Sequence, residues 1–148
     1  MQAVPKHNED RAFQLLGLAW ANVDKQSLQK MTQTLLAQQR KDGGWGQHPT
    51  LESDAYATGQ ALVALHQAGG LPVTHRAYQR GVSYLLADQA ADGSWRVLSR
   101  SFPFQKQFES GFPYGYNQWI SAAASSWATM ALILTVEAPA PLTGSGLE

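Results

Sequence analysis

Two segments of this 148-residue chain repeat at a spacing of fifty residues, and this repeat constrains the fold more than any other feature. In the alignment of residues 30–45 with residues 80–95, Lys30 matches Arg80, and each segment ends in an Asp-Gly-x-Trp sequence. Matches of several residue types at one fixed spacing are typical of repeat architectures. We therefore expect supersecondary units that each bury one face on a neighbour.

A second, looser repeat follows each of these segments. Residues 54–65 recur as residues 121–132, at an offset of 67 instead of 50. The second unit therefore carries about seventeen extra residues, which lie between Trp95 and Ile120.

The sequence predicts five helices of two alternating kinds. Some are amphipathic, with Leu28, Met31 and Leu35 on a single apolar face, whereas others are alanine-rich and apolar nearly all round. A helix that is apolar on all sides needs cover on all sides, so the alternation predicts an inner layer and an outer layer. The expected helices span residues 8–22, 26–40, 54–68, 75–90 and 118–136.

The second segment resembles the QW motif of squalene-hopene and oxidosqualene cyclases. That motif reads basic, Gly, two residues, aromatic, aliphatic, three residues, Gln, a short spacer, then Gly-x-Trp, and Arg80 to Trp95 fits it throughout. The first copy departs from it at Met31 and Thr34. The resemblance implies the α/α toroid superfamily, which also includes the β-subunits of protein prenyltransferases. It implies an all-α partial toroid of alternating inner and outer antiparallel helices over residues 8–136, because a complete toroid has six helices of each kind.

We interpret the glutamines and tryptophans of the two segments as structural. Gln39 and Gln89 are expected in the last turn of an outer helix, where an amide can bond to unpaired backbone groups. Trp45 and Trp95 are expected to cover the following turn, with the indole N–H donating to a carbonyl. Contact of these residues with a ligand is the alternative.

Candidate catalytic residues lie before the third helix. The resemblance implies class II cyclases, which are isomerases that protonate an alkene or epoxide with an Asp-x-Asp-Asp motif, and this chain has no such motif. Its nearest counterpart is Glu52-Ser53-Asp54, because two carboxyls at this spacing can share a proton and raise one pKa. The alternative is that Ser53 or Asp54 caps the helix. The absence of an Asp-x-Asp-Asp motif counts against catalysis by this chain on its own. Tyr56 is expected beside the cavity of the toroid.

An aromatic loop over residues 96–118 is the second candidate site. Pro103 and Pro113 interrupt any continuous helix there. The rings fit three interpretations: a lid on the toroid, a site for an isoprenoid or other apolar ligand, and a protein interface. Three basic residues of the loop are candidates for a diphosphate or for a solvated face. The aromatic residues are Phe102, Phe104, Phe108, Phe112, Tyr114, Tyr116 and Trp119, and the basic ones are Arg96, Arg100 and Lys106.

Composition narrows the choice of partners. The formal net charge is zero, so we expect no nucleic-acid partner. Without cysteine or paired histidines, we expect no metal and no cofactor. No apolar run reaches ~18 residues, so we expect no transmembrane segment and a soluble chain, with the cytoplasm as the default compartment. We expect no secretory signal at the N-terminus, and we interpret residues 137–148 as a disordered tail in which residues 144–148 resemble a cloning linker.

Two functional hypotheses remain. In the first, the chain is part of a cyclase-like toroid that binds an isoprenoid or other apolar ligand. In the second, it is a non-catalytic repeat module that completes its ring by self-association or on another domain. Charged residues make up only 15% of the chain, so we expect a homo-oligomer or a missing parent domain to cover its open ends.

Overall fold

The computed structural model describes residues 5–102, 106 and 108–136, and this part of the chain is helical. An isolated bridge between Gly46 and Ser53 is its only β-type pairing. The all-α fold class and all five predicted helices are confirmed, with ends that differ by a few residues. The elements are α1 (Asn8–Trp20), α2 (Lys25–Leu36), α3 (Ala55–Gln67), α4 (Arg76–Asp88), a 3₁₀ turn η1 (Gly115–Asn117) and α5 (Gln118–Ile133).

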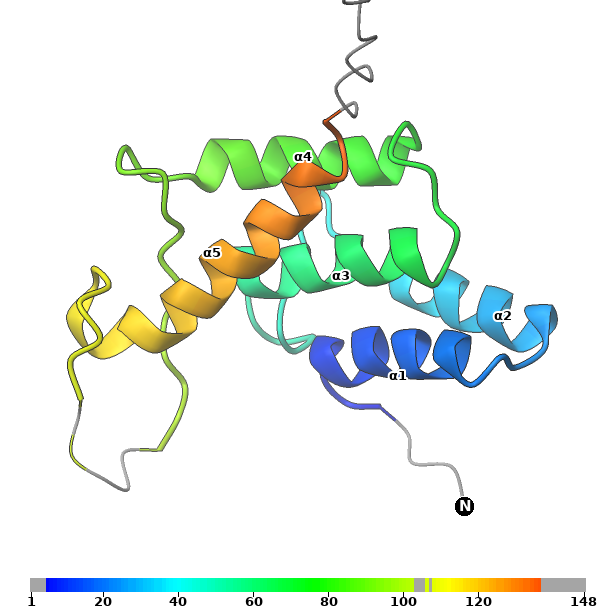
Figure 1. Ribbon diagram of the computed structural model, residues 1–148, viewed down its shortest axis with the longest axis horizontal. Coiled ribbons are helices and arrows are strands. Elements are labelled where there is room, and N and C mark those ends of the chain that lie inside the picture. The colour runs from blue at the N-terminus through cyan, green and yellow to red at the C-terminus, as the bar shows by residue number, and fades with distance from the viewer. Residues whose placement is uncertain (1–4, 103–105, 107, 137–148) are drawn as a thin grey trace, which may run out of the picture.

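The helices form two layers, as a partial α/α toroid requires. α1, α3 and α5 form the inner layer, with α3 between the other two, and α2 and α4 lie on its outer side (Figure 1). Small residues allow the inner helices to approach closely. A Cβ on Gly59 of α3 would lie 2.6 Å from the backbone carbon of Trp127 in α5, so only glycine fits there.

Only the central inner helix is covered on all sides. α3 is buried from Ala57 to Leu65. Within the described chain, α1 and α5 lack the expected cover on one side, since Trp20 is 75% exposed and Ile133 is 61% exposed. The reason is position, since α3 has inner helices on both sides within the described chain and each edge helix has one.

The two tryptophan turns, residues 39–45 and 89–95, close the ends of the outer helices. Trp45 donates its indole N–H to the carbonyl of Leu35 at 2.9 Å, and Trp95 donates to Leu85 at 2.7 Å, which confirms the predicted bonds. Both indoles are buried.

The glutamines of these turns lie just beyond the helices, not in their last turns. Gln39 follows the end of α2 by three residues and Gln89 directly follows α4. Their amides donate across the turn to the carbonyls of Gly43 and Gly93, both at 2.9 Å. The predicted helices ended at residues 40 and 90, whereas α2 ends at Leu36 and α4 at Asp88.

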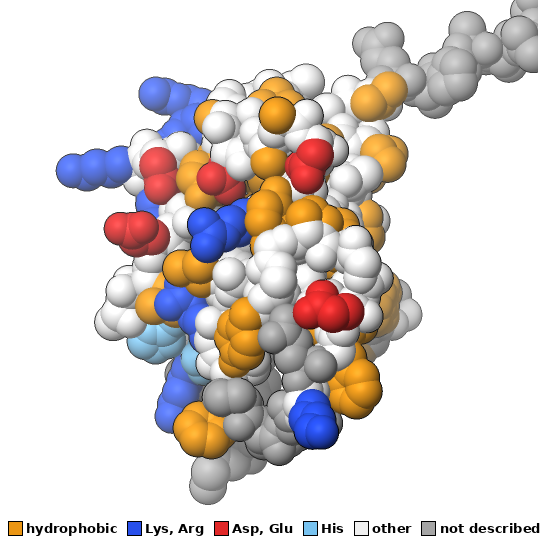
Figure 2. Space-filling view, turned by 90° about the vertical axis from the view of Figure 1, so that its left-hand side faces the viewer, with side chains coloured by type: hydrophobic (Ala, Val, Ile, Leu, Met, Phe, Trp, Pro, Cys, Tyr) orange, Lys and Arg blue, Asp and Glu red, His pale blue; other side chains and the backbone are white. Residues whose placement is uncertain are grey.

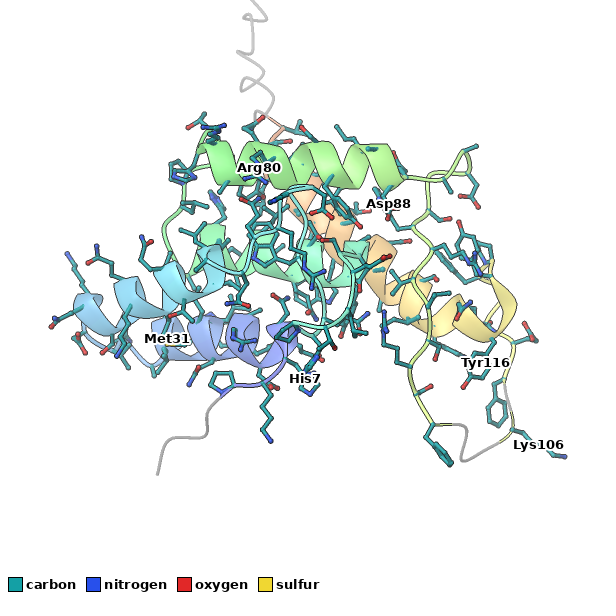
Figure 3. The ribbon with its side chains drawn as sticks, turned by 180° about the vertical axis from the view of Figure 1, so that it is seen from behind. His7, Met31, Arg80, Asp88, Lys106 and Tyr116 are labelled. Atoms are coloured by element: carbon teal, nitrogen blue, oxygen red, sulfur yellow. The ribbon has the colours of Figure 1, made fainter. Side chains whose placement is uncertain are left out.

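The first tryptophan turn also holds the next outer helix. Gln39 donates to the carbonyl of Ala77 in α4 at 2.7 Å, and the Arg80 guanidinium donates back to the carbonyls of Arg40 and Lys41. Arg80 projects from α4 over this turn (Figure 3). A Cβ on Gly43 would lie 2.5 Å from the carbonyl oxygen of Arg80, so the two backbones are in direct contact.

Candidate functional site

A pocket of about 380 Å³ lies where α5 begins. We call it the mouth pocket. Figure 1 shows that α1, α3 and α5 all start at this end of the molecule. One wall of the pocket comes from the first residues of the aromatic loop and from the turn before α3, and the other comes from α5. Its lining residues are Gln47, Ser99, Arg100 and Ser101 on the first wall and Trp119, Ile120 and Ala123 on the second.

The segment from Trp95 to Ser99 is attached to α5 at regular intervals. The backbone N–H of Trp95 donates to Ser125 Oγ at 3.0 Å, and that of Val97 donates to Ser121 Oγ at 3.0 Å. Two residues of extended chain span ~6.6 Å and four residues of helix span ~6 Å, so the two periods match. This match fixes the first wall of the pocket against the second.

A third backbone N–H of this segment, that of Ser99, is also bonded to a side chain, and this bond holds a residue that lines the pocket. Ser99 donates its N–H to Asn117 Oδ1 at 2.8 Å, and its hydroxyl lies 2.9 Å from that of Ser101. Tyr116 donates its hydroxyl to the carbonyl of Ser101 at 3.1 Å. Arg100 therefore projects from a short segment that is held on both sides.

Trp119 is the aromatic residue of the pocket. It belongs to the first turn of α5, and its indole N–H donates to the carbonyl of Phe108 at 3.1 Å. The ring is 58% exposed, so its orientation is fixed while much of its surface stays open. An exposed ring of fixed orientation suits contact with an apolar ligand.

Asp54 is bound behind the pocket wall. It caps α3 by accepting the N–H of Ala57 at 2.8 Å, and its other oxygen accepts the amide of Gln47 at 2.9 Å. Burial raises the pKa of Asp54 above its ordinary value, although these two donors and the Arg100 guanidinium act in the opposite direction. Asp54 is therefore both a helix cap, one of the alternatives from the sequence, and a carboxyl that holds its proton more tightly than usual.

The other two predicted residues of this region are Glu52, before α3, and Tyr56, in its first turn. Glu52 is exposed. Tyr56 donates its hydroxyl to Glu9 of α1 at 3.0 Å, and burial together with that carboxylate raises the pKa of Tyr56 to about 12. Tyr56 thus links two inner helices.

The aromatic residues of the loop do not form one cluster in the described chain. Phe102 is 84% exposed and Phe108 is 66% exposed, whereas Tyr114 turns inward so that its hydroxyl lies 2.6 Å from that of Ser94. Phe112 lies 6.4 Å from Tyr114, centroid to centroid, and Phe104 lies outside the described residues. Figure 2, which faces this side, shows apolar side chains interspersed with charged ones.

Most residues of the first wall of the pocket, which we call the polar wall, were not predicted from the sequence. Gln47, Ser99 and Ser101 were not singled out, and Arg100 was noted only as one of several basic residues. A signal was present, because Ser121 and Ser125 lie four residues apart on one face of an apolar helix. Paired hydroxyls at that spacing indicate a polar neighbour along the helix.

Two further observations concern other kinds of site. In the described ranges no three His, Cys, Asp or Glu side chains lie together in a way that would hold a metal ion. No helix among the described residues is long and apolar enough to cross a membrane.

Comparison with known proteins agrees with this architecture. The family model of the squalene-hopene cyclase C-terminal domain matches residues 10–117, which is more than half of the chain. The chain belongs to this family. The match covers α1 to α4, both tryptophan turns and the polar wall, and it ends where α5 begins.

Two relatives show the same kinship. A drimenyl diphosphate synthase of Streptantibioticus cattleyicolor is 40% identical over 65 residues, which cover 44% of this chain and 12% of the relative. A squalene–hopene cyclase of Bradyrhizobium diazoefficiens is 35% identical over 102 residues, which cover 60% of this chain and 15% of the relative. The matched region thus spans less than a sixth of either relative.

Proposed function

We propose that this chain is part of a terpene-cyclase-like toroid in which the mouth pocket binds an isoprenoid or another apolar ligand. The observation that carries the proposal is the α5 wall of the pocket, where the exposed face of Trp119 adjoins Ile120 and Ala123. Family membership supports the same ligand class, since one relative is named for squalene and the other for drimenyl diphosphate.

Within this proposal, Asp54 is the candidate proton donor. Its carboxyl has a raised pKa and bonds to Gln47, which itself lines the pocket. Asp54 does not itself line the pocket, so the Gln47 side chain would have to move aside for the carboxyl to reach an alkene carbon. Transfer of its proton to that carbon would leave a carboxylate and a carbocation, which an aromatic face stabilises. Glu52 is exposed to solvent, which makes it the weaker candidate. The proposed binding does not depend on this step.

The melting temperature with and without farnesol tests the binding. We expect farnesol to raise the melting temperature, and Trp119→Ala to abolish most of that rise. Trp20→Ala is the matched control. Trp20 is also exposed, but it lies at the C-terminal end of α1, whereas the pocket lies at the end of the molecule where α1 starts. A melting temperature that no isoprenoid raises would overturn the proposal.

Mass spectrometry of the products tests the role of Asp54 separately. If Asp54 donates the proton, farnesol still raises the melting temperature of the Asp54→Asn variant, but this variant forms none of the cyclised product that the parent chain forms. Undiminished product from that variant would exclude Asp54 as the acid.

A second function is favoured by the exposed C-terminal side of the chain. Met130 is 43% exposed and Ile133 is 61% exposed on α5, and Gln89 of the second tryptophan turn is exposed. These surfaces fit a repeat module that completes its ring by self-association or on another domain. Light scattering at several concentrations tests self-association, and a concentration-independent monomer would contradict it.

A further inference from the structure

A second pocket, of about 260 Å³, lies beside the start of α1, where Figure 3 labels His7. Its walls come from α1, from the residues that follow α2 and from the loop before α3. It shares no lining residue with the mouth pocket. The guanidinium groups of Arg11 and Arg40 line it, and we call it the arginine pocket. No carboxylate of the described chain lines it.

Backbone carbonyls hold both guanidinium groups in place. Arg40 Nη2 donates to the carbonyls of His48 and Pro49 at 3.2 and 3.3 Å. Arg11 Nη1 donates to the carbonyl of Lys6 at 3.2 Å. A guanidinium has five N–H donors, so each group keeps donors for a ligand. Both side chains are half-buried, and carbonyls alone do not neutralise their charge, so the pocket favours an anion.

Negative groups close to the pocket are already paired. The Asp10 carboxylate accepts two backbone N–H groups. The bond from the His7 N–H is the main cause of the lowered pKa of Asp10, and the charge of Arg11 contributes a smaller part. At the C-terminal end of α2, the carbonyls of Leu35 and Leu36 accept N–H groups from the following turn. These groups reduce the positive potential of the pocket without occupying its guanidinium donors.

An amide oxygen without a partner is a further feature of this pocket. Asn8, the first residue of α1, lines the pocket and is 3% exposed. Its Nδ2 donates to the carbonyl of Ala57 at 3.0 Å, whereas its Oδ1 is buried and accepts no hydrogen bond from the described chain. Buried polar atoms are rarely left unpaired, because the lost bonds to water are not replaced. An O–H donor of a ligand would satisfy this oxygen.

We propose that the arginine pocket binds a small phosphate ester that carries a hydroxyl group, with the phosphate between Arg11 and Arg40 and the hydroxyl on Asn8 Oδ1. Guanidinium groups bind phosphate oxygens with paired, charge-assisted hydrogen bonds. A phosphate monoester carries a charge of about −1.5 to −2 at neutral pH, which matches two guanidinium groups, whereas a monocarboxylate would match one. The inference is independent of the proposed function, because the two pockets have different lining residues.

Three probes separate the contributions of phosphate and hydroxyl in a calorimetric titration at low salt: glycerol phosphate, ethyl phosphate and glycerol. We expect both esters to bind and glycerol to give no heat of binding, because the charge-assisted bonds to the two arginines supply most of the affinity. Glycerol phosphate should bind about tenfold more tightly than ethyl phosphate, since only glycerol phosphate has a hydroxyl for the unpaired oxygen of Asn8.

Arg11→Gln is the diagnostic variant. It should weaken the binding of both esters about tenfold or more, because it removes one of the two guanidinium groups. Arg76→Gln is the matched control. Arg76 is an exposed residue at the start of α4 that does not line the pocket, so the same change of charge should leave both affinities unchanged.

Arg40→Lys is a second diagnostic variant. It keeps the positive charge at the turn but loses the planar group that binds phosphate with paired bonds. It should also weaken the binding of both esters, and it therefore tests the pocket even if Arg11→Gln does not fold.

The outcomes distinguish this inference from the proposed function. An absence of heat with both esters would overturn the inference. Equal losses of affinity in Arg11→Gln and Arg76→Gln would also overturn it, since the esters would then respond only to overall charge. Equal affinities for the two esters would overturn the assignment of the hydroxyl to Asn8. None of these results involves farnesol, so the proposed function of the mouth pocket is tested separately.

Discussion

The first and second repeats share the tryptophan turn and differ in what surrounds it. In both, the tryptophan backbone N–H donates to a hydroxyl of the following inner helix, from Trp45 to Thr58 at 2.9 Å and from Trp95 to Ser125 at 3.0 Å. The glycine of the first turn, Gly43, is buried against the next outer helix, whereas Gly93 is exposed. The same motif thus packs against the next outer helix in the first repeat and is exposed in the second.

The connection to the inner helix differs as well. The first repeat reaches α3 through a short loop closed by the Gly46–Ser53 bridge, and Asp54 caps that helix. In the second repeat the inserted residues intervene, and α5 begins at Gln118, so Ser121, at the position of Asp54, lies inside the helix and bonds to Val97. Where the first repeat has a short, closed loop before its inner helix, the second repeat therefore has the polar wall of a pocket.

The largest expected difference between the repeats concerns their glycines. Both Gly43 and Gly93 have positive φ, so alanine costs about 1–2 kcal/mol at either position. At Gly43 the new methyl also meets the carbonyl of Arg80, which adds about 1–3 kcal/mol. Urea denaturation should show a clearly larger loss of unfolding free energy for Gly43→Ala than for Gly93→Ala. Equal losses would contradict the difference between a turn that packs against an outer helix and a turn that is exposed.

The hydroxyls that hold the tryptophan turns should behave alike. Thr58→Val and Ser125→Ala each leave a tryptophan backbone N–H without its acceptor, at a cost of about 1–3 kcal/mol when the group is buried. Thermal unfolding measures both losses. If one variant is as stable as the parent chain, that hydroxyl does not hold its turn and the equivalence of the repeats fails.

The glutamines should again separate the two repeats, by a smaller amount. Gln39→Ala removes a bond to α4 as well as the bond across its own turn, and we expect a loss of about 1–2 kcal/mol. Gln89→Ala removes a single bond at an exposed side chain, so the loss should stay within about 0.5 kcal/mol. Denaturant midpoints provide the comparison, and the reverse order would contradict the contact between Gln39 and α4.

The smallest effect is a pH dependence at Asp54, whose counterpart in the second repeat is Ser121, which has no titratable side chain. The pKa of Asp54 is raised in the folded chain, so its contribution to stability is greatest below its ordinary pKa of about 3.8 and is lost as the pH rises through the raised value. Asp54→Asn retains a capping side chain and removes this titration. Denaturation curves from acid to neutral pH should therefore show the variant gaining stability relative to the parent chain, and Ser121→Ala should show no such trend.

The parts that the sequence predicted are those with local causes. The helices follow from apolar periodicity, and the indole bonds to Leu35 and Leu85 follow from a tryptophan that lies ten residues beyond each carbonyl. The bond from Gln39 to α4 and the attachment of Val97 to Ser121 depend on how separate elements meet in space. The repeat pattern alone did not show that, among the described residues, Gly43 is buried against Arg80 whereas Gly93 is exposed.

The candidate site was predicted only in part for the same reason. Trp119 and Asp54 stood out by residue type, but Gln47 and Arg100 matter through their positions beside the pocket. The attachment to α5 sets the position of Arg100, and the spacing of Ser121 and Ser125 indicates a polar neighbour there without identifying which segment it is.

The central claim is that the insertion of the second repeat forms a ligand pocket. The most direct measurement is a backbone amide NMR titration of the ¹⁵N-labelled chain with farnesol. We predict shift changes concentrated at Ser99–Ser101 and Trp119–Ala123, with the first tryptophan turn unaffected. Changes confined to the groove between α2 and the α3–α4 turn, lined by Leu28, Leu36 and Leu71, would contradict it, as would a spectrum that farnesol leaves unchanged.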